Sequence, residues 1–525
     1  MQIQNPRVRT IAAMRGCRWV VSLVVGGVAL VHGTLGHSPA HAQCEMAKFV
    51  ASDGSSRDMF GEAVAVSDDV AVVGAGLDDD GGMNTGSAYV YRFDGAGWVL
   101  DGKLLANDRA PSDHFGRAVA VSGNAILVGA HGDDDNGIDS GSAYVFRYNG
   151  LAWMQEQKLT AADGTSSDAF GSAVAISDDV AVIGAWGDAE NGGKSGSAYV
   201  FRYNGSVWVQ ESKLLPAVGA AYEYFGWSVA VSGDAVLVGV WGDSTLGSLA
   251  GAVYVFRHSG LTWAQEMKLQ ASDWSDQAFF GWSVALSGDA AAIGAWGDAD
   301  NGTDAGAVYV FLDTGSGWVE QAKLTVDDGM PNDSFGRAVA VSGNTVVAGA
   351  LGDGDNGDES GSVSVFQNAG SGWASVGKLL AHDGAAGDRF GEAVAVSNGR
   401  LMIGTPKDDD KGSDAGAAYG FSLTAADCND NGFCDSRDID DGTSTDTNGN
   451  GVPDECEGYG DFDSDTDVDL ADFGHFQTCF NGPNRPPAMT GCGNADSDID
   501  GDVDLVDFFA FQACFNGPNR PLACH

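Results

Sequence analysis

Basic residues are scarce in this chain. Its 525 residues include 27 lysines and arginines against 73 aspartates and glutamates, which gives a formal net charge of −46. Nucleic acids and anionic membrane surfaces would repel such a chain, so we expect neither as a partner. The acidity favours bound cations or a cationic partner, or it serves solubility.

Two catalytic motifs and one metal-binding motif are absent. The sequence contains neither HExxH nor GxSxG, and its cysteines form no CxxC pair. The Gly242-Asp243-Ser244 stretch resembles an esterase motif only superficially, because its Gly-Asp belongs to a repeat described below. These absences argue against a zinc site and against the common hydrolase classes.

A confident membrane span is also missing. Residues 1–42 are typical of a secretory signal, with four arginines, an apolar core over Trp19–Leu30 and Ala40-His41-Ala42 as the cleavage site. The apolar core is short and interrupted by glycine, so no membrane span should remain after cleavage. We therefore expect a secreted or cell-surface protein.

A 55-residue repeat occupies most of the remaining chain. Phe60-Gly61 returns six more times without insertion or deletion, up to Phe390-Gly391. Each unit contains four short apolar runs separated by turn residues, which is typical of a four-stranded antiparallel sheet. The pattern predicts an all-β fold, a seven-bladed β-propeller over residues 43–423.

The phase of the repeat also predicts how the ring closes. A Lys-Leu pair such as Lys103-Leu104 marks the fourth strand of six blades, but the seventh blade has no such pair after it. Lys48-Phe49 lies 55 residues before Lys103. The N-terminal segment should therefore supply the missing strand of the last blade.

These motifs resemble FG-GAP repeats, the blades of integrin α-subunit propellers and their bacterial relatives. The likeness rests on Phe-Gly before strand one, on Val-Gly-Ala or Ile403–Pro406 ending strand two, and on Gly-Ser-Ala-Tyr-Val-Tyr in strand three. It implies a propeller used for adhesion or protein binding. Integrin blades bind calcium through D-x-D-x-D-G between strands one and two, whereas the turn here is a short Ser-Asp-Asp or similar. Calcium is therefore not expected at that position.

One aspartate recurs in the loop between strands two and three of every copy. Either it caps its own loop through backbone N–H groups, with glycines at positive φ, or the loops bind calcium, as in residues 298–304. Both interpretations remain open from the sequence. The seven positions are Asp78, Asp133, Asp188, Asp243, Asp298, Asp353 and Asp408.

Tryptophans fall into two groups. Six hold one position in strand four and should be core residues: Trp98, Trp153, Trp208, Trp263, Trp318 and Trp373. The others should lie over blades three to five, on or near the propeller face that carries the loops with the recurring aspartates. They either pack around the central channel or form a binding platform for a protein or glycan. The candidate ligand-binding residues are Trp186, Trp227, Trp241, Trp274, Trp282 and Trp296, with Tyr222 and Tyr224.

Acidic residues after Leu423 have the spacing of calcium loops, with ligands at positions 1, 3, 5, 9 and 12. Asp467 and Asp502, at position 7, should ligate only through their carbonyls. The first loop offers Asp461, Asp463, Asp465, Asp469 and Asp472, and the second offers Asp496, Asp498, Asp500, Asp504 and Asp507. This duplicated loop-helix unit, residues 459–525, resembles a dockerin, which implies a cohesin-like scaffold as partner. Its recognition positions hold Leu470-Ala471 and Leu505-Val506, not the usual polar pair, so a cell-surface scaffold is an alternative.

A cysteine-rich segment over residues 424–458 precedes that unit and resembles thrombospondin type-3 calcium repeats. The resemblance implies calcium as the bound ion. Its two loops offer Asp427, Asn429, Asn431, Asp435 and Asp438, then Asp446, Asn448, Asn450, Asp454 and Glu457.

Eight cysteines follow the signal, an even number that predicts four disulfides in an exported chain. In the seventh blade the turn between strands three and four is interrupted, because these strands come from opposite ends of the propeller. The repeat places the two interrupted ends near Cys44 and Cys428, since 55 residues beyond Trp373 is position 428 and 55 before Trp98 is position 43. We predict a Cys44–Cys428 clasp; a Cys428–Cys434 bridge that leaves Cys44 free is the competitor. The remaining pairs would be Cys434–Cys456, Cys479–Cys492 and Cys514–Cys524.

The sequence thus predicts a secreted, calcium-dependent binding or adhesion protein that is not an enzyme. The propeller would bind an extracellular protein or glycan, and the C-terminal module would anchor it. An extracellular polysaccharide-active hydrolase or lyase is the alternative, since acid pairs on an aromatic face could cleave sugars. A purely structural surface protein is a third hypothesis.

Overall fold

The computed structural model describes residues 43–445 except 96, 426, 429 and 430, and it also describes residues 453, 470–480, 503, 505, 507 and 508. The signal prediction falls on residues outside this set, as do most residues of the dockerin-like unit. No helix among the described residues has both the length and the apolar character needed to cross a membrane.

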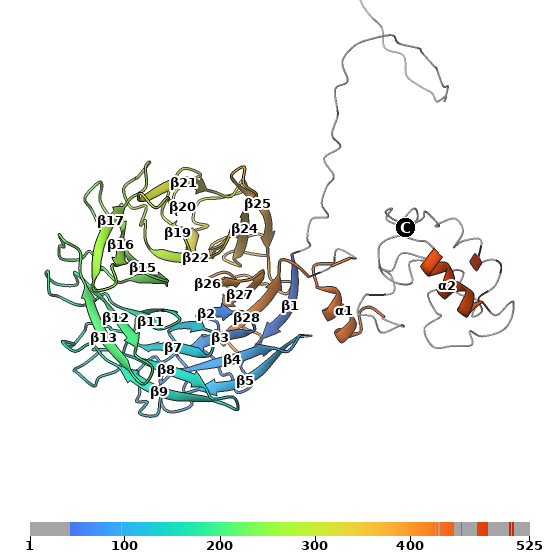
Figure 1. The fold of residues 1–525 in the computed structure, drawn as a ribbon, viewed down its shortest axis with the longest axis horizontal. Helices are drawn as coiled ribbons and strands as arrows, with labels where there is room; N and C mark the ends of the chain where they lie inside the picture. The colour runs from blue at the N-terminus through green and yellow to red at the C-terminus, as the bar shows by residue number, and fades with distance from the viewer. Residues whose placement is uncertain are drawn as a thin grey trace, which may run out of the picture. The chain divides into compact units, whose positions relative to one another are not determined.

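Seven four-stranded antiparallel sheets are arranged around one centre (Figure 1). This confirms the predicted seven-bladed propeller. The first four blades run in chain order. They are β2 (Ala63–Ser67), β3 (Val70–Ala75), β4 (Ser87–Phe93) and β5 (Trp98–Leu104); β6 (Ala118–Ser122), β7 (Ala125–Ala130), β8 (Ser142–Tyr148) and β9 (Trp153–Leu159); β10 (Ala173–Ser177), β11 (Val180–Ala185), β12 (Ser197–Tyr203) and β13 (Trp208–Leu214); β14 (Ser228–Ser232), β15 (Ala235–Val240), β16 (Ala252–His258) and β17 (Trp263–Leu269).

The last three blades complete the circle, and the residues described after them include two short helices. The elements are β18 (Ser283–Ser287), β19 (Ala290–Ala295), β20 (Ala307–Asp313) and β21 (Trp318–Leu324); β22 (Phe335–Ser342), β23 (Thr345–Ala350), β24 (Ser362–Asn368) and β25 (Trp373–Leu379); β26 (Ala393–Ser397), β27 (Arg400–Thr405) and β28 (Ala417–Ser422), with β1 (Cys44–Phe49); and then α1 (Asp435–Asp441) and α2 (Leu470–Cys479).

The N-terminal strand closes the ring, as predicted. Strand β1 pairs antiparallel with β28, with Glu45 opposite Phe421 and Phe49 opposite Ala418. Blade seven therefore combines residues from both ends of the propeller, in the order β1-β28-β27-β26.

The core lies between neighbouring blades. In blade one, Val72 and Val90 pack toward blade two, whereas Ala71 and Val73 pack toward blade seven. Successive strand residues point to opposite faces of a sheet. A blade with a neighbour on each side therefore needs apolar residues at both odd and even positions of its strands. Four of the six strand-four tryptophans are buried, while Trp98 and Trp373 are partly buried against the same clusters.

The Phe-Gly motif joins each blade to the preceding one. The N–H of Phe115 donates to the carbonyl of Thr85, across the blade boundary, at 3.0 Å. Gly116 has φ of +97°, and a Cβ there would stand 2.1 Å from the carbonyl oxygen of Ser87. The motif requires glycine because the neighbouring backbone occupies the space of a side chain.

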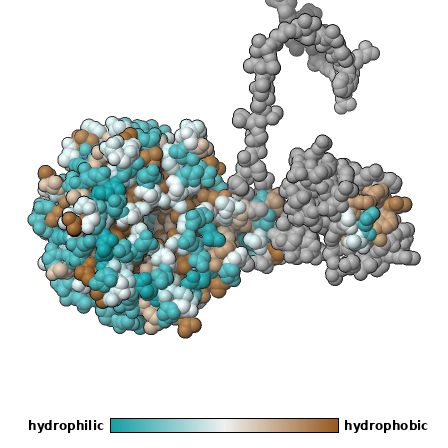
Figure 2. All heavy atoms as spheres, viewed as in Figure 1, coloured by the Kyte–Doolittle hydropathy of each residue, from teal (hydrophilic) through white to brown (hydrophobic). Residues whose placement is uncertain are grey.

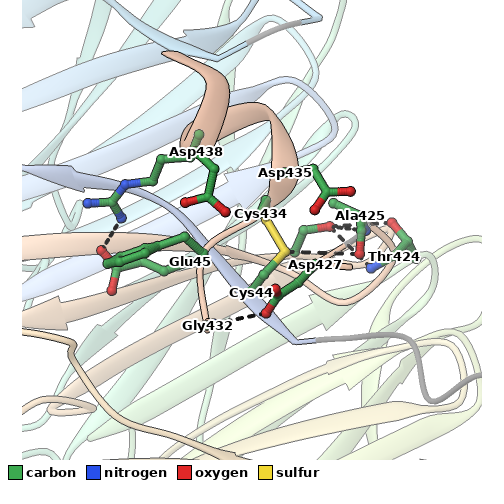
Figure 3. Close-up of a disulfide and its surroundings, with 12 residues drawn as sticks. Cys44, Glu45, Thr424, Ala425, Asp427, Gly432, Cys434, Asp435 and Asp438 are labelled. Atoms are coloured by element: carbon green, nitrogen blue, oxygen red, sulfur yellow. Dashed lines mark hydrogen bonds and ion pairs between the residues drawn. A yellow bond between two sulfur atoms is a disulfide. The ribbon is translucent and has the colours of Figure 1, made fainter. Parts of the chain in front are cut away.

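A disulfide joins β1 to the segment after the propeller, but its partner differs from the predicted one. Cys44 bonds to Cys434, with the Cα atoms 4.9 Å apart (Figure 3). The predicted Cys44–Cys428 clasp and the predicted Cys434–Cys456 pair are therefore wrong, and so is the competing Cys428–Cys434 bridge. Cys428 and Cys479 each take part in a disulfide as well. Cys456, Cys492, Cys514 and Cys524 lie outside the described residues.

Local backbone pairing explains the change of partner. The segment after Leu423 turns back and pairs parallel to β1 at Glu45 and Phe433. The Glu45 N–H donates to the Gly432 carbonyl at 2.9 Å, and the Cys434 N–H donates to the Glu45 carbonyl at 3.2 Å. This pairing places Cys434 beside Cys44. An ion pair of 2.5 Å between Arg437 and Glu45 further fixes α1 against β1.

Candidate functional site

A lysine from strand four lies among the loop carboxylates of each blade. In blade two, Lys158 Nζ is 2.8 Å from both Asp133 and Asp108 and 2.6 Å from Asp135. Asp108 comes from the loop before the blade, and Asp133 and Asp135 come from the loop between β7 and β8. The ring of Tyr144 lies 5.3 Å from the same ammonium. We call this arrangement a lysine cage.

The cage decides the role of the recurring aspartates. Asp133 is buried and accepts hydrogen bonds from the N–H of Asp135 at 3.1 Å and from the hydroxyl of Tyr144 at 2.9 Å. Gly137 and Gly141 have positive φ in the same loop. The loop-capping interpretation therefore describes this geometry, and the cation facing the carboxylates is a lysine of the chain itself. The equivalent lysines are Lys48, Lys103, Lys158, Lys213, Lys268, Lys323 and Lys378.

Blade four has a reduced cage. Lys268 meets Asp243 at 2.5 Å and the Thr245 hydroxyl at 2.9 Å, because Thr245 and Val218 stand where other blades supply carboxylates. In the loop highlighted for calcium, Asp298 and Asp300 both contact Lys323, at 2.9 and 2.6 Å. The sequence signal for the cage was a lysine and an aspartate that each recur at a fixed position of the 55-residue repeat.

Six of the eight aromatic candidates come together on one face of the propeller. This face carries the loops between strands two and three of a blade and the loops from strand four to strand one of the next blade. Phe279, which the sequence interpretation missed, joins them. Trp274 and Tyr222 remain apart on exposed loops, and among the described residues neither ring contacts this group. We call the group the aromatic arc: Trp186, Tyr224, Trp227, Trp241, Phe279, Trp282 and Trp296.

A stacked pair repeats along the arc. The residue before Phe-Gly stacks on the residue that follows strand two, as in Tyr224 on Trp241 and Phe279 on Trp296, both with centroids 4.6 Å apart. Tyr224 and Phe279 have φ of 58° and 55°, a conformation that costs energy for any residue but glycine. The repeat position shared with Tyr224 was the signal that could have revealed Phe279.

A cavity of about 320 Å³ lies at the mouth of the central channel, beside the arc. The residues that directly follow Phe-Gly in all seven copies line it, together with His131 and Trp186. We call it the channel-mouth pocket. The seven are Glu62, Arg117, Ser172, Trp227, Trp282, Arg337 and Glu392.

The charges of this pocket are unevenly paired. Arg117 forms an ion pair with Glu62. The guanidinium of Arg337 instead lies over two indole rings, with centroid distances of 4.3 Å to Trp282 and 5.7 Å to Trp296. Burial lowers the pKa of Arg337 from its ordinary value. The pocket can offer flat apolar surface and a positive charge to a ligand.

Comparison with known proteins agrees with this geometry. The FG-GAP repeat family matches residues 44–91, 98–146, 153–201, 208–256, 263–311, 318–366 and 373–421. The chain belongs to the FG-GAP repeat family. The crystal structure of Saccharomyces cerevisiae Sqt1 is 11% identical, with a TM-score of 0.40, and the match covers 73% of this chain and 99% of that one. This likeness is too low to bear on function, and no curated protein matches the chain.

A histidine pair at the pocket wall should make the stability of the FG-GAP propeller sensitive to pH. His131 stacks on His114 with ring centroids 5.1 Å apart, and its buried Nδ1 has no hydrogen-bond partner among the described residues. Burial, followed by the charges of His114 and Arg117, lowers the pKa of His131 to about 4. Between the unfolded value of about 6.5 and pH 4, the unfolded chain binds the proton more readily, so stability falls as pH falls.

His131→Phe should remove this pH dependence while keeping the ring stack. Between pH 7 and pH 5, the free energy of unfolding of wild type should fall by on the order of 1–2 kcal/mol more than that of the variant. Urea unfolding at both pH values measures the difference. Equal losses in the two proteins would contradict the assignment to His131.

The first predicted calcium loop after the FG-GAP propeller is partly described. Buried Asp427 accepts hydrogen bonds from the N–H groups of Asn431 and Gly432, at 3.1 and 2.9 Å. The side-chain amide of Asn431 donates to buried Asp438 at 3.0 Å, and buried Asp435 accepts from the Cys428 N–H at 2.9 Å. Carboxylate and amide oxygens are the ligands that calcium prefers, so the residues present fit the ion.

The C-terminal repeats are described only in part. Phe508 lies near Phe473 and Phe476 of α2, with ring centroids 6.2 and 6.0 Å apart, and Val503 and Asp507 are buried. For Asp472 the structure gives the backbone within α2. The remaining predicted ligands lie outside the described residues: Asn429, Asp446, Asn448, Asn450, Asp454, Glu457, Asp461, Asp463, Asp465, Asp469, Asp496, Asp498, Asp500 and Asp504.

Proposed function

We propose that this FG-GAP protein is a secreted, calcium-dependent binding or adhesion protein. Its channel-mouth pocket and aromatic arc hold an extracellular protein or glycan. Its C-terminal module anchors it to a cohesin-like or cell-surface scaffold. The observation that carries the proposal is the arc, because half-buried tryptophans gathered around a cavity are typical of recognition sites.

The charges beside the pocket support binding over hydrolysis. Glycosidases need one protonated and one ionised carboxyl group on either side of the scissile bond. Here Glu62 is ion-paired with Arg117, and Glu392 lies 3.9 Å from Arg389. Both carboxyl groups thus lie beside a guanidinium of the chain itself, which differs from a general acid and a second carboxylate placed around a bond to be cleaved.

An array of glycans and secreted proteins, probed with the full chain, tests the proposal. Trp282→Ala should no longer bind the ligands that wild type captures, and its stability should change little. The matched control is Trp153→Ala, whose buried ring donates a 2.9 Å hydrogen bond to Asp101 in the outer core. That variant should lose about 3–5 kcal/mol of stability and keep its ligands. Capture of every ligand by Trp282→Ala would contradict the proposal.

Calcium should bind to the region after Leu423 with a dissociation constant on the order of 10⁻⁴–10⁻³ M, the range of extracellular modules. Calorimetry on the full chain measures it. Asp438→Asn should reduce the stoichiometry, because it weakens a buried ligand, whereas Asp441→Asn should not, since Asp441 is exposed at the end of α1. Absence of heat at millimolar calcium would contradict the calcium part of the proposal.

A further inference from the structure

One arginine of the channel-mouth pocket, Arg337, has no carboxylate in contact with it among the described residues, and Glu392 of the same pocket acts on it only at longer range. Among the described residues, no carboxylate oxygen lies within 4.0 Å of the Arg337 guanidinium, and its side chain makes no hydrogen bond. Its environment is the face of two indoles, 4.3 Å away at Trp282 and 5.7 Å at Trp296. Acidic residues outnumber basic ones by 73 to 27 in this chain, so an arginine in a cavity wall that no carboxylate contacts calls for an explanation.

A second cation lies at the other end of the arc. Lys194 Nζ is 5.0 Å from the ring centroid of Trp186 and has no ion-pair partner among the described residues. Other arginines near the pocket are paired, Arg117 with Glu62 and Arg389 with Glu359 at 2.9 Å. The aromatic arc therefore bears two positive charges that no carboxylate of the described residues contacts, although Glu392 across the same pocket attracts Arg337 at longer range.

These charges narrow the chemistry of the ligand. An incoming cation would find indole faces that Arg337 and Lys194 already cover, and like charge would repel it. A neutral ligand would leave a partly buried guanidinium without an acceptor, which costs free energy. A carboxylate would satisfy Arg337 with two parallel hydrogen bonds, the geometry that guanidinium groups favour.

The size and walls of the pocket narrow it further. A cavity of about 320 Å³ lies at the lower end of the range for small-molecule sites, so it admits one or two rings and not a folded surface. Trp227 offers an aromatic wall, and Ser172 and His131 offer polar groups on the same cavity. Aromatic surface beside hydrogen-bonding groups suits a sugar ring, which has an apolar face and a polar edge.

We infer that the channel-mouth pocket binds the terminal acidic sugar of a glycan, with its carboxylate on Arg337 and its ring against Trp227 and Trp282. The inference rests on the proposed function, because it names the ligand class of the same site. Long-range repulsion from the acidic chain opposes a long polyanion, so recognition of one terminal residue fits the net charge better than binding along a strand.

The test measures binding of the full chain to labelled trigalacturonate, triglucuronate and neutral maltotriose. At least one acidic trisaccharide should bind, maltotriose should not, and Arg337→Gln should weaken binding about tenfold or more. The matched control is Arg400→Gln, which removes a guanidinium stacked 4.3 Å from Phe93 outside the pocket and should leave affinity unchanged. Thermal unfolding of both variants verifies that they fold.

The alternative outcomes separate the inference from the proposed function. Equal binding of maltotriose, or unchanged affinity in Arg337→Gln, overturns the acidic-sugar inference and leaves the binding function standing. Capture of only a secreted protein, lost in Trp282→Ala, also overturns the inference alone. If no ligand of either class depends on Trp282, both the inference and the proposed function are overturned.

Discussion

Cys44→Ser should destabilise the propeller by about 4–5 kcal/mol. The Cys44–Cys434 disulfide joins residues 390 positions apart, so it restricts the unfolded chain over nearly the whole propeller. In the chain-entropy account the stabilisation grows with the length of the closed loop, which places this bond at the upper end of the range. Equilibrium unfolding in guanidinium chloride measures the loss.

Two controls isolate this bond from the other disulfides. The Cys44→Ser/Cys434→Ser double variant should match the single variant, because both lack the same bond. A reductant should destabilise wild type more than either variant. Identical unfolding of wild type and Cys44→Ser would show that the bond does not hold the ring closed.

Lys158→Met should cost about 3–5 kcal/mol, the effect of removing one partner from a buried ion pair. Nζ of Lys158 is the only positive group that contacts Asp133 among the described residues, and Asp133 is 3% exposed. Without it, Asp108, Asp133 and Asp135 repel one another, because their ligand oxygens lie within 4.8 Å. Methionine keeps most of the side-chain volume, so the loss reports the charge.

The matched control for the cage is Lys411→Met. Lys411 is exposed and makes no ion pair among the described residues, so this variant should change stability by no more than about 0.5 kcal/mol. Denaturant unfolding compares the two variants with wild type. A loss below 1 kcal/mol in Lys158→Met would mean that water, and not the lysine, stabilises these carboxylates.

The sequence predicted the ring because its repeat has no insertions. A constant 55-residue phase fixed four strands per blade and showed that Lys48 belongs to the last one. The same phase contained the lysine cages, since Lys158 and Asp133 recur together, but pairing them required knowing that β9 and the β7–β8 loop meet at one face.

Where the repeat stops, sequence arithmetic could not identify contacts. The position equivalent to Trp98 in blade seven suggested Cys428, yet the chain there leaves the blade pattern. Glu45 pairs with residues 432–434 through backbone hydrogen bonds that no other blade has, and this brings Cys434 to Cys44. Similarly, Arg337 occupies a repeat position that holds Glu, Ser, Trp or a differently paired Arg elsewhere, so its contact with Trp282 follows only from the folded ring.

The position of the disulfide also determines how this protein carries tension. A pulling force between the chain before Cys44 and the chain after Cys434 passes directly through the sulfur–sulfur bond. Residues 45–433, which form all seven blades, lie outside that path and bear no load. A propeller fixed at its C-terminal end and pulled at its N-terminal end would therefore keep its binding face intact until a covalent bond is reduced or broken.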